Sequence, residues 1–498
     1  MLFNSYEFIF AFFPIVIICF FLISRLHHAA ASIWMGLASI FFYGYWSLKA
    51  IPILLCSVCI NYWLGSKLTP TNAYATPNDA TEKNRKRYLV AALLGNIALL
   101  CFFKYANFFI ENINSVTVFL GHQSIPAINI VLPIGISFFT FTQIAFLVDC
   151  WQGKVKERNF SHYLLFVTYF PHLIAGPILH HAQLMPQFAR AETYRPHIEK
   201  MALGLAIFTI GLSKKLLIAD PLSEFANVFF KGVNAGITPQ FFDSWYGVLA
   251  YTFQIYFDFS GYSDMAIGLS LFIGIKLPIN FNSPYKARSI IDFWRRWHIS
   301  LSIFLRDYLY IPMGGNRKGK LRRYLNLFTT MLLGGLWHGA NWTFVLWGAA
   351  HGILLSVNHA WRWLAGNSIK PHAISSGIFW LMTFVSIIFT WVLFRSDNIA
   401  AALTVYKGML GIYGYAETSP ADDLIFMNLV RVPQVVALIL FAALITFGFN
   451  NANRLSASTA TKNGAVINPL YLGVFSGILL LVDLTQISKP SPFLYFQF

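Results

Sequence analysis

The sequence predicts an all-helical protein that crosses a membrane many times. Of its 498 residues 57% are hydrophobic, 17% are aromatic and only 11% are charged, against about 25% charged in an average soluble protein. Apolar runs that approach the roughly 20 residues needed to cross a bilayer recur along the whole chain. Because they leave no room for a sizeable soluble domain, we expect a single integral membrane domain over residues 1–498, with a catalytic core at about residues 160–360.

The first apolar run, residues 8–23, has no basic residue before it and no cleavage signature after it, so we interpret it as a retained span. Arg25 follows it, which places the N-terminus away from the cytosol and the basic loop at 83–87 on the cytosolic side. The polar stretch 70–87 is expected to be mobile. Further spans are expected at residues 30–46, 51–64, 88–110, 128–148, 201–211, 242–275, 325–336, 342–356, 378–393, 435–449 and 470–482.

Two apolar stretches are interrupted by Pro and Gly, at residues 169–178 and 279–315. Irregular backbone at membrane depth is tolerated only where protein or a water-filled cavity satisfies its polar groups. We therefore expect re-entrant or half-helical segments around an interior cavity, which is where chemistry would take place.

The formal net charge is +16, but the basic residues lie in short loops between apolar segments. Membrane topology and anionic lipid account for most of this charge, so nucleic acid is not an expected partner. The five cysteines lie in or beside apolar stretches and are assigned to packing. His180 and His181 are adjacent, but no acidic or Cys ligand stands at metal-binding spacing, so no metal site is expected.

Ten Lys or Arg residues crowd the stretch from Lys286 to Arg323, which contains the motif FWRRWHIS at 293–300. Guanidinium groups pair with phosphate oxygens, and Trp rings can cover the organic part of a donor such as coenzyme A. Alternatively, the segment is an interfacial helix whose Arg side chains meet lipid headgroups while its Trp side chains form an aromatic belt. On the first interpretation the donor-binding residues are Trp294, Arg295, Arg296, Trp297 and Arg306.

His338 lies in the motif GLWHG at 335–339, at the end of an apolar segment. Transfer of an acyl group from a thioester to a hydroxyl needs a group that takes the hydroxyl proton, and His is the commonest such group. The alternative is a His that is hydrogen-bonded between helices for packing. The flanking Gly335 and Gly339 favour the catalytic interpretation, because glycines let a substrate approach the backbone closely.

Three further polar residues occur within apolar surroundings. Asp258 and Asp264 interrupt the run 248–275, where they either pair with Arg295 or Arg296 or act directly. His172 lies in the Pro- and Gly-broken segment and is expected to line the interior. The sequence contains no G-x-S-x-G elbow, no phosphate-binding loop and no G-x-G-x-x-G after a strand, which argues against serine hydrolases, ATPases and Rossmann enzymes.

Six ordered motifs together resemble the membrane-bound O-acyltransferase family. Within it the similarity is greatest to the bacterial alginate O-acetyltransferase branch, with teichoic acid D-alanyl transferases as near relatives, and it spans nearly the whole chain. The motifs are FPHLIAGPILHH at 170–181, FDFSGYSDMAIG at 257–268, NFNSPY at 280–285, FWRRWHISLS at 293–302, GGLWHGANW at 334–342 and FLYFQF at 493–498.

The resemblance implies a ring of about 11 transmembrane helices, with half helices around a thinned centre and a funnel on each side. It places the invariant catalytic histidine of the family on His338 and the second polar position on His298. His338 would take the proton of the acceptor hydroxyl, with the thioester carbonyl near Trp337 and Asn341. His298 would position the donor or assist departure of the thiolate. For the connection 395–430 the resemblance implies nothing.

The expected function is transfer of an acetyl group from a cytosolic thioester, such as acetyl-CoA, across the bacterial inner membrane. The expected final acceptor is an exported polysaccharide such as alginate, reached through a periplasmic acetylesterase-like partner. No cofactor is expected to be bound. Peptidoglycan, cellulose or teichoic acid are alternative acceptors. Outside this class, a secondary transporter would need repeated halves, which the sequence does not show, and a non-catalytic scaffold for polysaccharide export is the third alternative.

Overall fold

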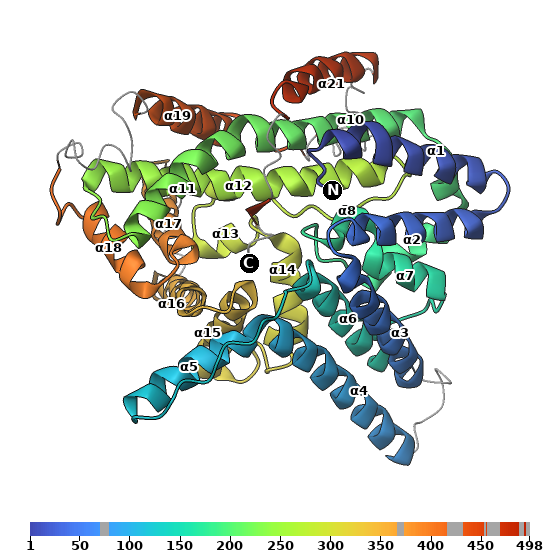
Figure 1. The fold of residues 1–498 in the computed structure, drawn as a ribbon, viewed down its shortest axis with the longest axis horizontal. Coiled ribbons are helices and arrows are strands. Elements are labelled where there is room, and N and C mark those ends of the chain that lie inside the picture. Colours follow the sequence, from blue (N-terminus) through green and yellow to red (C-terminus); the bar gives the residue numbers. More distant parts are fainter. Residues whose placement is uncertain are drawn as a thin grey trace. The chain divides into compact units, whose positions relative to one another are not determined.

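The computed structural model describes residues 1–69, 79–365, 373–415, 432–452, 455, 469–487 and 493–494. Every regular element in these ranges is a helix (Figure 1), which confirms the all-helical prediction for the described chain. Residues 70–78 of the polar loop, 416–430 of the connection 395–430 and 495–498 of the terminal motif lie outside the described residues. The chain forms two compact units, and its organisation as one catalytic domain stays a prediction.

The first unit comprises residues 1–208, 265–278 and 468–476. Pro14 and Pro52 each lie just after the point where a short π- or 3-10 helix passes into an α-helix, a change of hydrogen-bond pattern that suits a residue without a backbone N–H. Its helices are η1 (Glu7–Phe12), α1 (Phe13–Ser24), α2 (His28–Gly44), η2 (Leu48–Ala50), α3 (Ile51–Leu68), α4 (Asp79–Leu100), η3 (Cys101–Tyr105), α5 (Ala106–Phe119), α6 (Ile136–Trp151), α7 (Phe160–Thr168), α8 (Phe170–Leu173), α9 (His181–Phe188) and η4 (Ala191–Tyr194).

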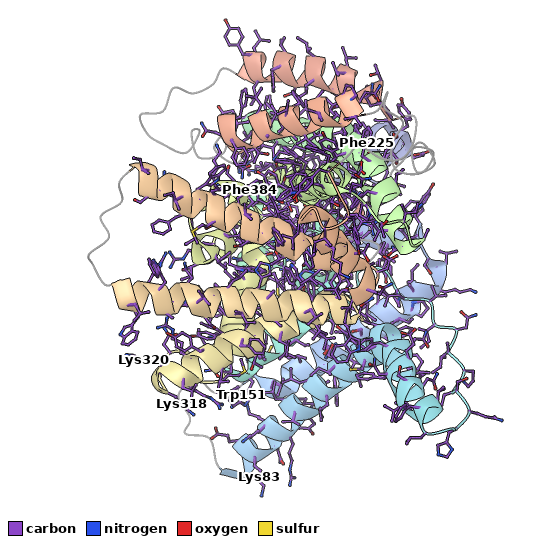
Figure 2. The ribbon with its side chains drawn as sticks, turned by 90° about the vertical axis from the view of Figure 1, so that its left-hand side faces the viewer. Lys83, Trp151, Phe225, Lys318, Lys320 and Phe384 are labelled. Carbon is purple, nitrogen blue, oxygen red and sulfur yellow. The ribbon has the colours of Figure 1, made fainter. Side chains whose placement is uncertain are left out.

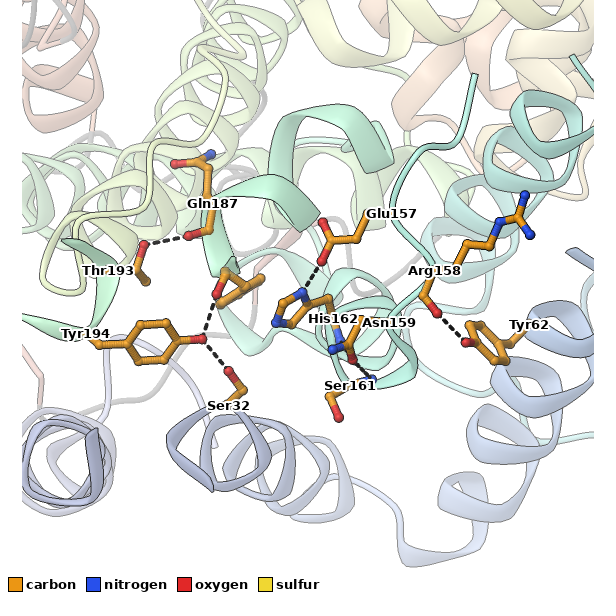
Figure 3. Close-up of polar contacts among 11 residues, drawn as sticks. Ser32, Tyr62, Glu157, Arg158, Asn159, Ser161, His162, Gln187, Thr193 and Tyr194 are labelled. Carbon is orange, nitrogen blue, oxygen red and sulfur yellow. Dashed lines mark hydrogen bonds and ion pairs between the residues drawn. The ribbon is translucent and has the colours of Figure 1, made fainter. Parts of the chain in front are cut away.

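Polar side chains tie the connections of this unit to its helices (Figure 3). The Tyr194 hydroxyl donates to the Phe188 carbonyl at 2.7 Å. The Ser32 hydroxyl lies 2.5 Å from the Tyr194 hydroxyl. The Asn159 side chain caps the start of α7. These bonds satisfy groups that would otherwise be orphaned where the helices end.

Two predictions for this unit have clear outcomes. The broken segment at 169–178 is confirmed as the short helix α8 followed by a turn. The span expected at 128–148 begins only at Ile136, so its first turns were wrongly predicted. Pro133 and the left-handed Gly135, with a φ of 71°, keep the preceding backbone out of the helix.

The second unit comprises residues 209–264, 279–467 and 477–498. Its helices are η5 (Lys214–Ala219), α11 (Asp220–Asn234), η6 (Pro284–Lys286), α13 (Ile290–Trp294), α14 (Ile299–Leu305), η7 (Arg306–Tyr310), α15 (Gly319–His338), α16 (Trp342–Ala365), α17 (Ala373–Arg395), α18 (Ile399–Met409) and α19 (Val432–Gly448). Three long helices contribute residues to both units, namely α10 (Ile198–Ser213), α12 (Phe241–Leu271) and α21 (Pro469–Leu484). The broken stretch 279–315 is confirmed as a succession of short helices.

Among the described residues, five helical stretches are long and apolar enough to cross a membrane. Large apolar side chains along them are exposed, for example Phe10 at 59% and Trp63 at 54%, as lipid-facing residues would be. The protein is therefore a membrane protein, whereas the ring of about 11 spans stays a prediction. The stretches are Glu7–Ser24, Leu48–Leu68, Glu82–Phe119, Ile198–Asn234 and Ile374–Arg395.

Candidate active site

His338 is the last residue of α15, in the second unit, and its side chain lies in an aromatic surrounding. It is only 4% exposed. The imidazole meets Trp347 of α16 edge to face at 5.2 Å between ring centroids, and Phe394 of α17 at 5.1 Å. A short extended link at Gly339 then turns the chain into α16. Three helices thus hold this ring in place.

The glycines beside His338 make room for α16. A Cβ atom on Gly335 would lie 2.3 Å from the Phe344 carbonyl oxygen, and one on Gly339 would lie 2.1 Å from the Phe344 ring. The expectation that these glycines let a substrate approach the backbone was therefore wrong. Gly335 allows α15 and α16 to pack backbone against backbone, as small residues do between membrane helices, and Gly339 makes room for the Phe344 ring.

His298 lies at a strained turn between α13 and α14. Its φ of 43° places a non-glycine residue in the left-handed region, a conformation that surrounding structure must hold in place. The side chain is fully buried. Nδ1 lies 3.2 Å from Asn280 Oδ1, which also accepts from the Ser300 backbone N–H. A backbone N–H can only donate, so the Asn280 atom that it meets is the acceptor oxygen. Nδ1 of His298 must therefore donate to this oxygen, and neutral His298 carries its proton on Nδ1.

Trp337 connects the two histidines. Its ring lies 6.4 Å from the His298 ring and 4.9 Å from the His338 ring, between centroids. The structure thus brings together three of the residues that the motifs single out. The Asn341 side chain, in contrast, caps α16 by accepting from the Thr343 N–H and donates to the Asp397 carbonyl at 2.7 Å, so its amide has a structural role.

The two tryptophans expected at a donor entrance are interior residues. Trp297 is 2% exposed and stacks on Phe293 at 5.6 Å, and Trp294 is 8% exposed. The Trp294 indole N–H donates to Nδ1 of His351 at 3.2 Å. Their rings shape the core of the site, and any part they take in binding a donor would be indirect.

Two arginines of this region are paired with carboxylates, and three that lie near His359 are not. Arg296 pairs with Asp292 at 2.9 Å, and Arg306 pairs with Asp307 through two bonds of 2.6 and 3.0 Å. Three others, Arg295, Arg323 and Arg362, have no carboxylate partner among the described residues. All three lie close enough to His359 for their charges to act on its imidazole.

These three unneutralised arginines form a cationic cluster around His359, where α13 ends, α15 begins and α16 ends. Arg362 also donates to Ser289, the residue that caps α13. Lys318 and Lys320 lie at the outer end of α15 (Figure 2) and add further positive charge there. Such a concentration of positive charge attracts anionic ligands.

The acidic pair of α12 is neutralised by lysines rather than by arginines. Lys215 lies 2.6 Å from Asp258, and Lys214 lies 2.6 Å from Asp264. The predicted pairing of Asp258 with Arg295 or Arg296 was therefore wrong. The cause is the close packing of α10 on α12, where a Cβ on Gly261 would come within 2.7 Å of the Gly211 carbonyl oxygen.

The chain terminus closes this acidic cluster. Asp258 also accepts the backbone N–H of Leu494 at 2.8 Å, and the Lys215 ammonium lies 4.8 Å from the centre of the Phe493 ring. Asp220 provides a second carboxylate to Lys215 at 2.7 Å. Because buried charges are tolerated when they are paired and hydrogen-bonded, this arrangement has a structural role.

Comparison with known proteins decides the family. The sequence matches the family model of membrane-bound O-acyltransferases over residues 136–395, more than half of the chain. This chain belongs to the membrane-bound O-acyltransferase family. It is therefore an acyltransferase, and both His298 and His338 fall inside the matched residues.

Three relatives place this O-acyltransferase more closely. The peptidoglycan O-acetyltransferase of Helicobacter pylori is 39% identical, over 100% of this chain and 98% of that protein. A probable alginate O-acetylase, AlgI, of Pseudomonas syringae pv. tomato is also 39% identical, over 93% of this chain and 86% of that protein. The teichoic acid D-alanyltransferase of Bacillus subtilis is 29% identical, over 50% and 67% respectively.

His172 of this O-acyltransferase belongs to the first unit. It is 3% exposed and its Nε2 donates to the Phe166 carbonyl at 3.0 Å, which ties α8 to the last turns of α7. His181 pairs with Asp149 at 3.1 Å in the same unit. No group of three His, Cys, Asp or Glu side chains suited to a metal ion occurs in the part of the chain that the structure describes.

Sequence reasoning missed two groups of residues in this acyltransferase. Arg323 and Arg362 lie outside the motif that drew attention to Arg295, and only folding brings all three to His359. His351 resembles an ordinary residue of an apolar helix, although Trp347 one turn earlier offers a signal. The two residues are four positions apart in sequence, which places them on one helix face.

Proposed function

We propose that this acyltransferase moves an acetyl group from a thioester donor to a hydroxyl of an exported polysaccharide, with His338 as the general base. The observation that carries the proposal is that two buried imidazoles, His338 and His298, both pack near the ring of Trp337. Membership of the family supports the reaction type, and the position of His338 in the motif GLWHG supports its role.

In this reaction a nitrogen of neutral His338 takes the proton of the acceptor hydroxyl as its oxygen attacks the thioester carbonyl carbon. A C–O bond forms and the carbonyl electrons move to the oxygen. When they return, the C–S bond breaks and the sulfur leaves with the electron pair. The proton on His338 then passes to the thiolate, which gives an ester, a free thiol and neutral His338.

His298 serves to position the donor in this proposal. With the proton of the neutral ring on Nδ1 and bound to Asn280, the other ring nitrogen is an acceptor. An acceptor can orient an N–H or S–H group but cannot protonate a leaving thiolate. The hydrogen-bond geometry therefore favours positioning over acid catalysis, the two roles that the sequence left open.

The donor in this proposal carries phosphates, as coenzyme A does, and binds at the cationic cluster of Arg295, Arg323 and Arg362. Guanidinium groups without carboxylate partners are available to pair with phosphate oxygens. The excess of basic residues supports a cytosolic position for this cluster, at the bacterial inner membrane. The acetyl group would then cross the membrane through the site to an acceptor on the other side.

The acceptor is defined here as a class. Two relatives with the same 39% identity are named for peptidoglycan and for alginate. Equal identity to both gives no reason to choose one polymer, so the proposal specifies a polysaccharide hydroxyl, reached through a periplasmic partner.

The proposal is tested by the O-acetyl content of the cell-envelope polysaccharide in a strain that lacks its own copy of the gene. Wild type and His338→Ala are expressed to equal levels in the membrane. We expect the variant to lose acetylation by on the order of 100-fold or more, since a general base contributes about that much. His122→Ala, at an exposed position, serves as the control. Full acetylation with His338→Ala would contradict the assignment.

A further inference from the structure

The proposed chemistry leaves one buried histidine of the second unit without a role. His351 lies on α16, one turn after Trp347, and is fully buried. Its ring meets Trp347 at 4.6 Å, and Trp347 in turn meets His338 at 5.2 Å, between centroids. His351 is thus one aromatic ring away from the proposed base.

The hydrogen bond from Trp294 fixes the protonation of His351. An indole N–H can only donate, so Nδ1 of His351 must accept, and the ring proton lies on Nε2. A doubly protonated ring could not accept this bond. His351 is consequently neutral whenever the bond is formed, which excludes it as a charged group in the core.

The same bond joins two elements that carry the proposed site. Trp294 ends α13, a helix of only five residues, and His298 follows four residues later. The Ser302 hydroxyl of α14 donates to the Trp294 carbonyl at 3.0 Å. A bond that holds the Trp294 side chain in place therefore also limits movement of the strained turn at His298. On the other side of that bond, α16 carries Trp347, the ring that packs on His338.

Packing alone does not account for His351. Its Nε2–H is buried and has no hydrogen-bond partner among the residues that the structure describes. Leaving a buried donor unsatisfied costs about 1–3 kcal/mol, which a leucine would avoid. If His351 only filled space in the core, a leucine would be more favourable. What the imidazole provides and a leucine lacks is Nδ1, the acceptor of the Trp294 bond.

We propose that His351 is a positioning residue, whose hydrogen bond to Trp294 holds α13 on α16 and thereby sets the placement of His298 relative to His338. The inference rests on the proposed function, because it assumes that these two histidines carry the reaction. It predicts that loss of the bond slows the chemical step and leaves donor binding nearly unchanged.

The test compares His351→Leu, Trp294→Phe and His351→Asn in the purified full chain, with acetyl-CoA as the donor. The first two variants should lower kcat by on the order of 10- to 100-fold, as small misplacements of reacting groups do, with KM changed by less than about 2-fold. The Asn oxygen can take the place of Nδ1, so His351→Asn should restore most of the rate. The double variant that combines His351→Leu with Trp294→Phe should be no slower than either single variant, because both changes remove one bond.

Trp245→Phe is the matched control, since it removes an indole bond to the Met409 carbonyl outside this aromatic cluster. It should leave kcat unchanged. Wild-type kcat in both single variants, additive losses, or a His351→Asn variant as slow as His351→Leu would overturn the inference. If His351→Leu does not fold, as thermal unfolding would reveal, Trp294→Phe and His351→Asn decide alone. His338→Ala in the same assay separates the two proposals. Its activity tests whether His338 is the general base, whereas the Trp294 and His351 variants test the positioning role of His351.

Discussion

At the scale of single residues, the site depends on which nitrogen of each histidine carries the proton. Asn280 sets this for His298, because its oxygen accepts both the Nδ1–H and the Ser300 backbone N–H. The left-handed backbone at His298 makes the arrangement costly to hold. Asn280 therefore acts as the residue that keeps a strained histidine in one orientation.

Replacement of Asn280 by Ala should lower kcat on the order of 10-fold or more, as loss of a group that orients a functional His does. Asn280→Asp keeps an oxygen at the same place and should retain more of the rate than Asn280→Ala. Steady-state kinetics with acetyl-CoA checks both variants. Equal rates in Asn280→Ala and wild type would show that the orientation of His298 does not limit the reaction.

At the scale of elements, the hairpin of α15 and α16 places His338. A Cβ atom on Gly348 would lie 2.4 Å from the Met331 carbonyl oxygen, and the Gly335 position is as tight. Backbone atoms cannot move aside as a side-chain tip can, so the two helices must separate if either glycine gains a methyl group. The base at the end of α15 would then shift relative to Trp347.

Gly348→Ala should lower the free energy of unfolding by about 1–3 kcal/mol, the usual cost of overpacking, and should also reduce activity. The control is Gly377→Ala on α17, where a Cβ would meet nothing within 4 Å. That change should be neutral or slightly stabilising, because Ala favours helix over Gly by up to about 1 kcal/mol. Thermal unfolding in detergent compares the two, and a more stable Gly348→Ala protein would contradict this account of the hairpin.

The sequence predicted most elements because apolar length and breaker residues are local signals. It also singled out His338 and His298 from local motifs, and the structure places both rings near Trp337, while their catalytic roles stay predictions. It failed where a partner is distant in the chain. Lys215 meets Asp258, which lies 43 positions further along the sequence, and the three arginines around His359 come from separate helices. No pattern in the order of residues determines such pairings, since they follow from how glycine-rich helix faces pack.

At the scale of the whole molecule, charge is concentrated while the apolar fraction is high. The net charge of +16 includes the cationic cluster of Arg295, Arg323 and Arg362, which surrounds His359. An exposed cluster of this kind attracts anions over a distance that added salt shortens to about 8 Å at physiological ionic strength. The KM for the donor should therefore depend on salt concentration, whereas kcat, which reports the buried chemical step, should not.

Each of Arg295→Gln, Arg323→Gln and Arg362→Gln should raise the KM for acetyl-CoA by about 10-fold, because a hydrogen bond to a charged group contributes about 1.5 kcal/mol or more. The dependence of KM on salt should weaken in each. Arg306→Gln is the comparison, since Asp307 already neutralises that guanidinium, and its effect should be smaller. If all four variants behave alike, the donor phosphates bind elsewhere.

The claim on which the others depend is that His338 removes the proton of the acceptor hydroxyl. Its most direct test is the rate of thiol release from acetyl-CoA by the purified protein in lipid vesicles, with the polysaccharide acceptor and periplasmic partner supplied. The account predicts that His338→Ala reduces this rate on the order of 100-fold or more, at a temperature at which thermal unfolding shows that the variant is folded. Thiol release at the wild-type rate in His338→Ala would contradict it.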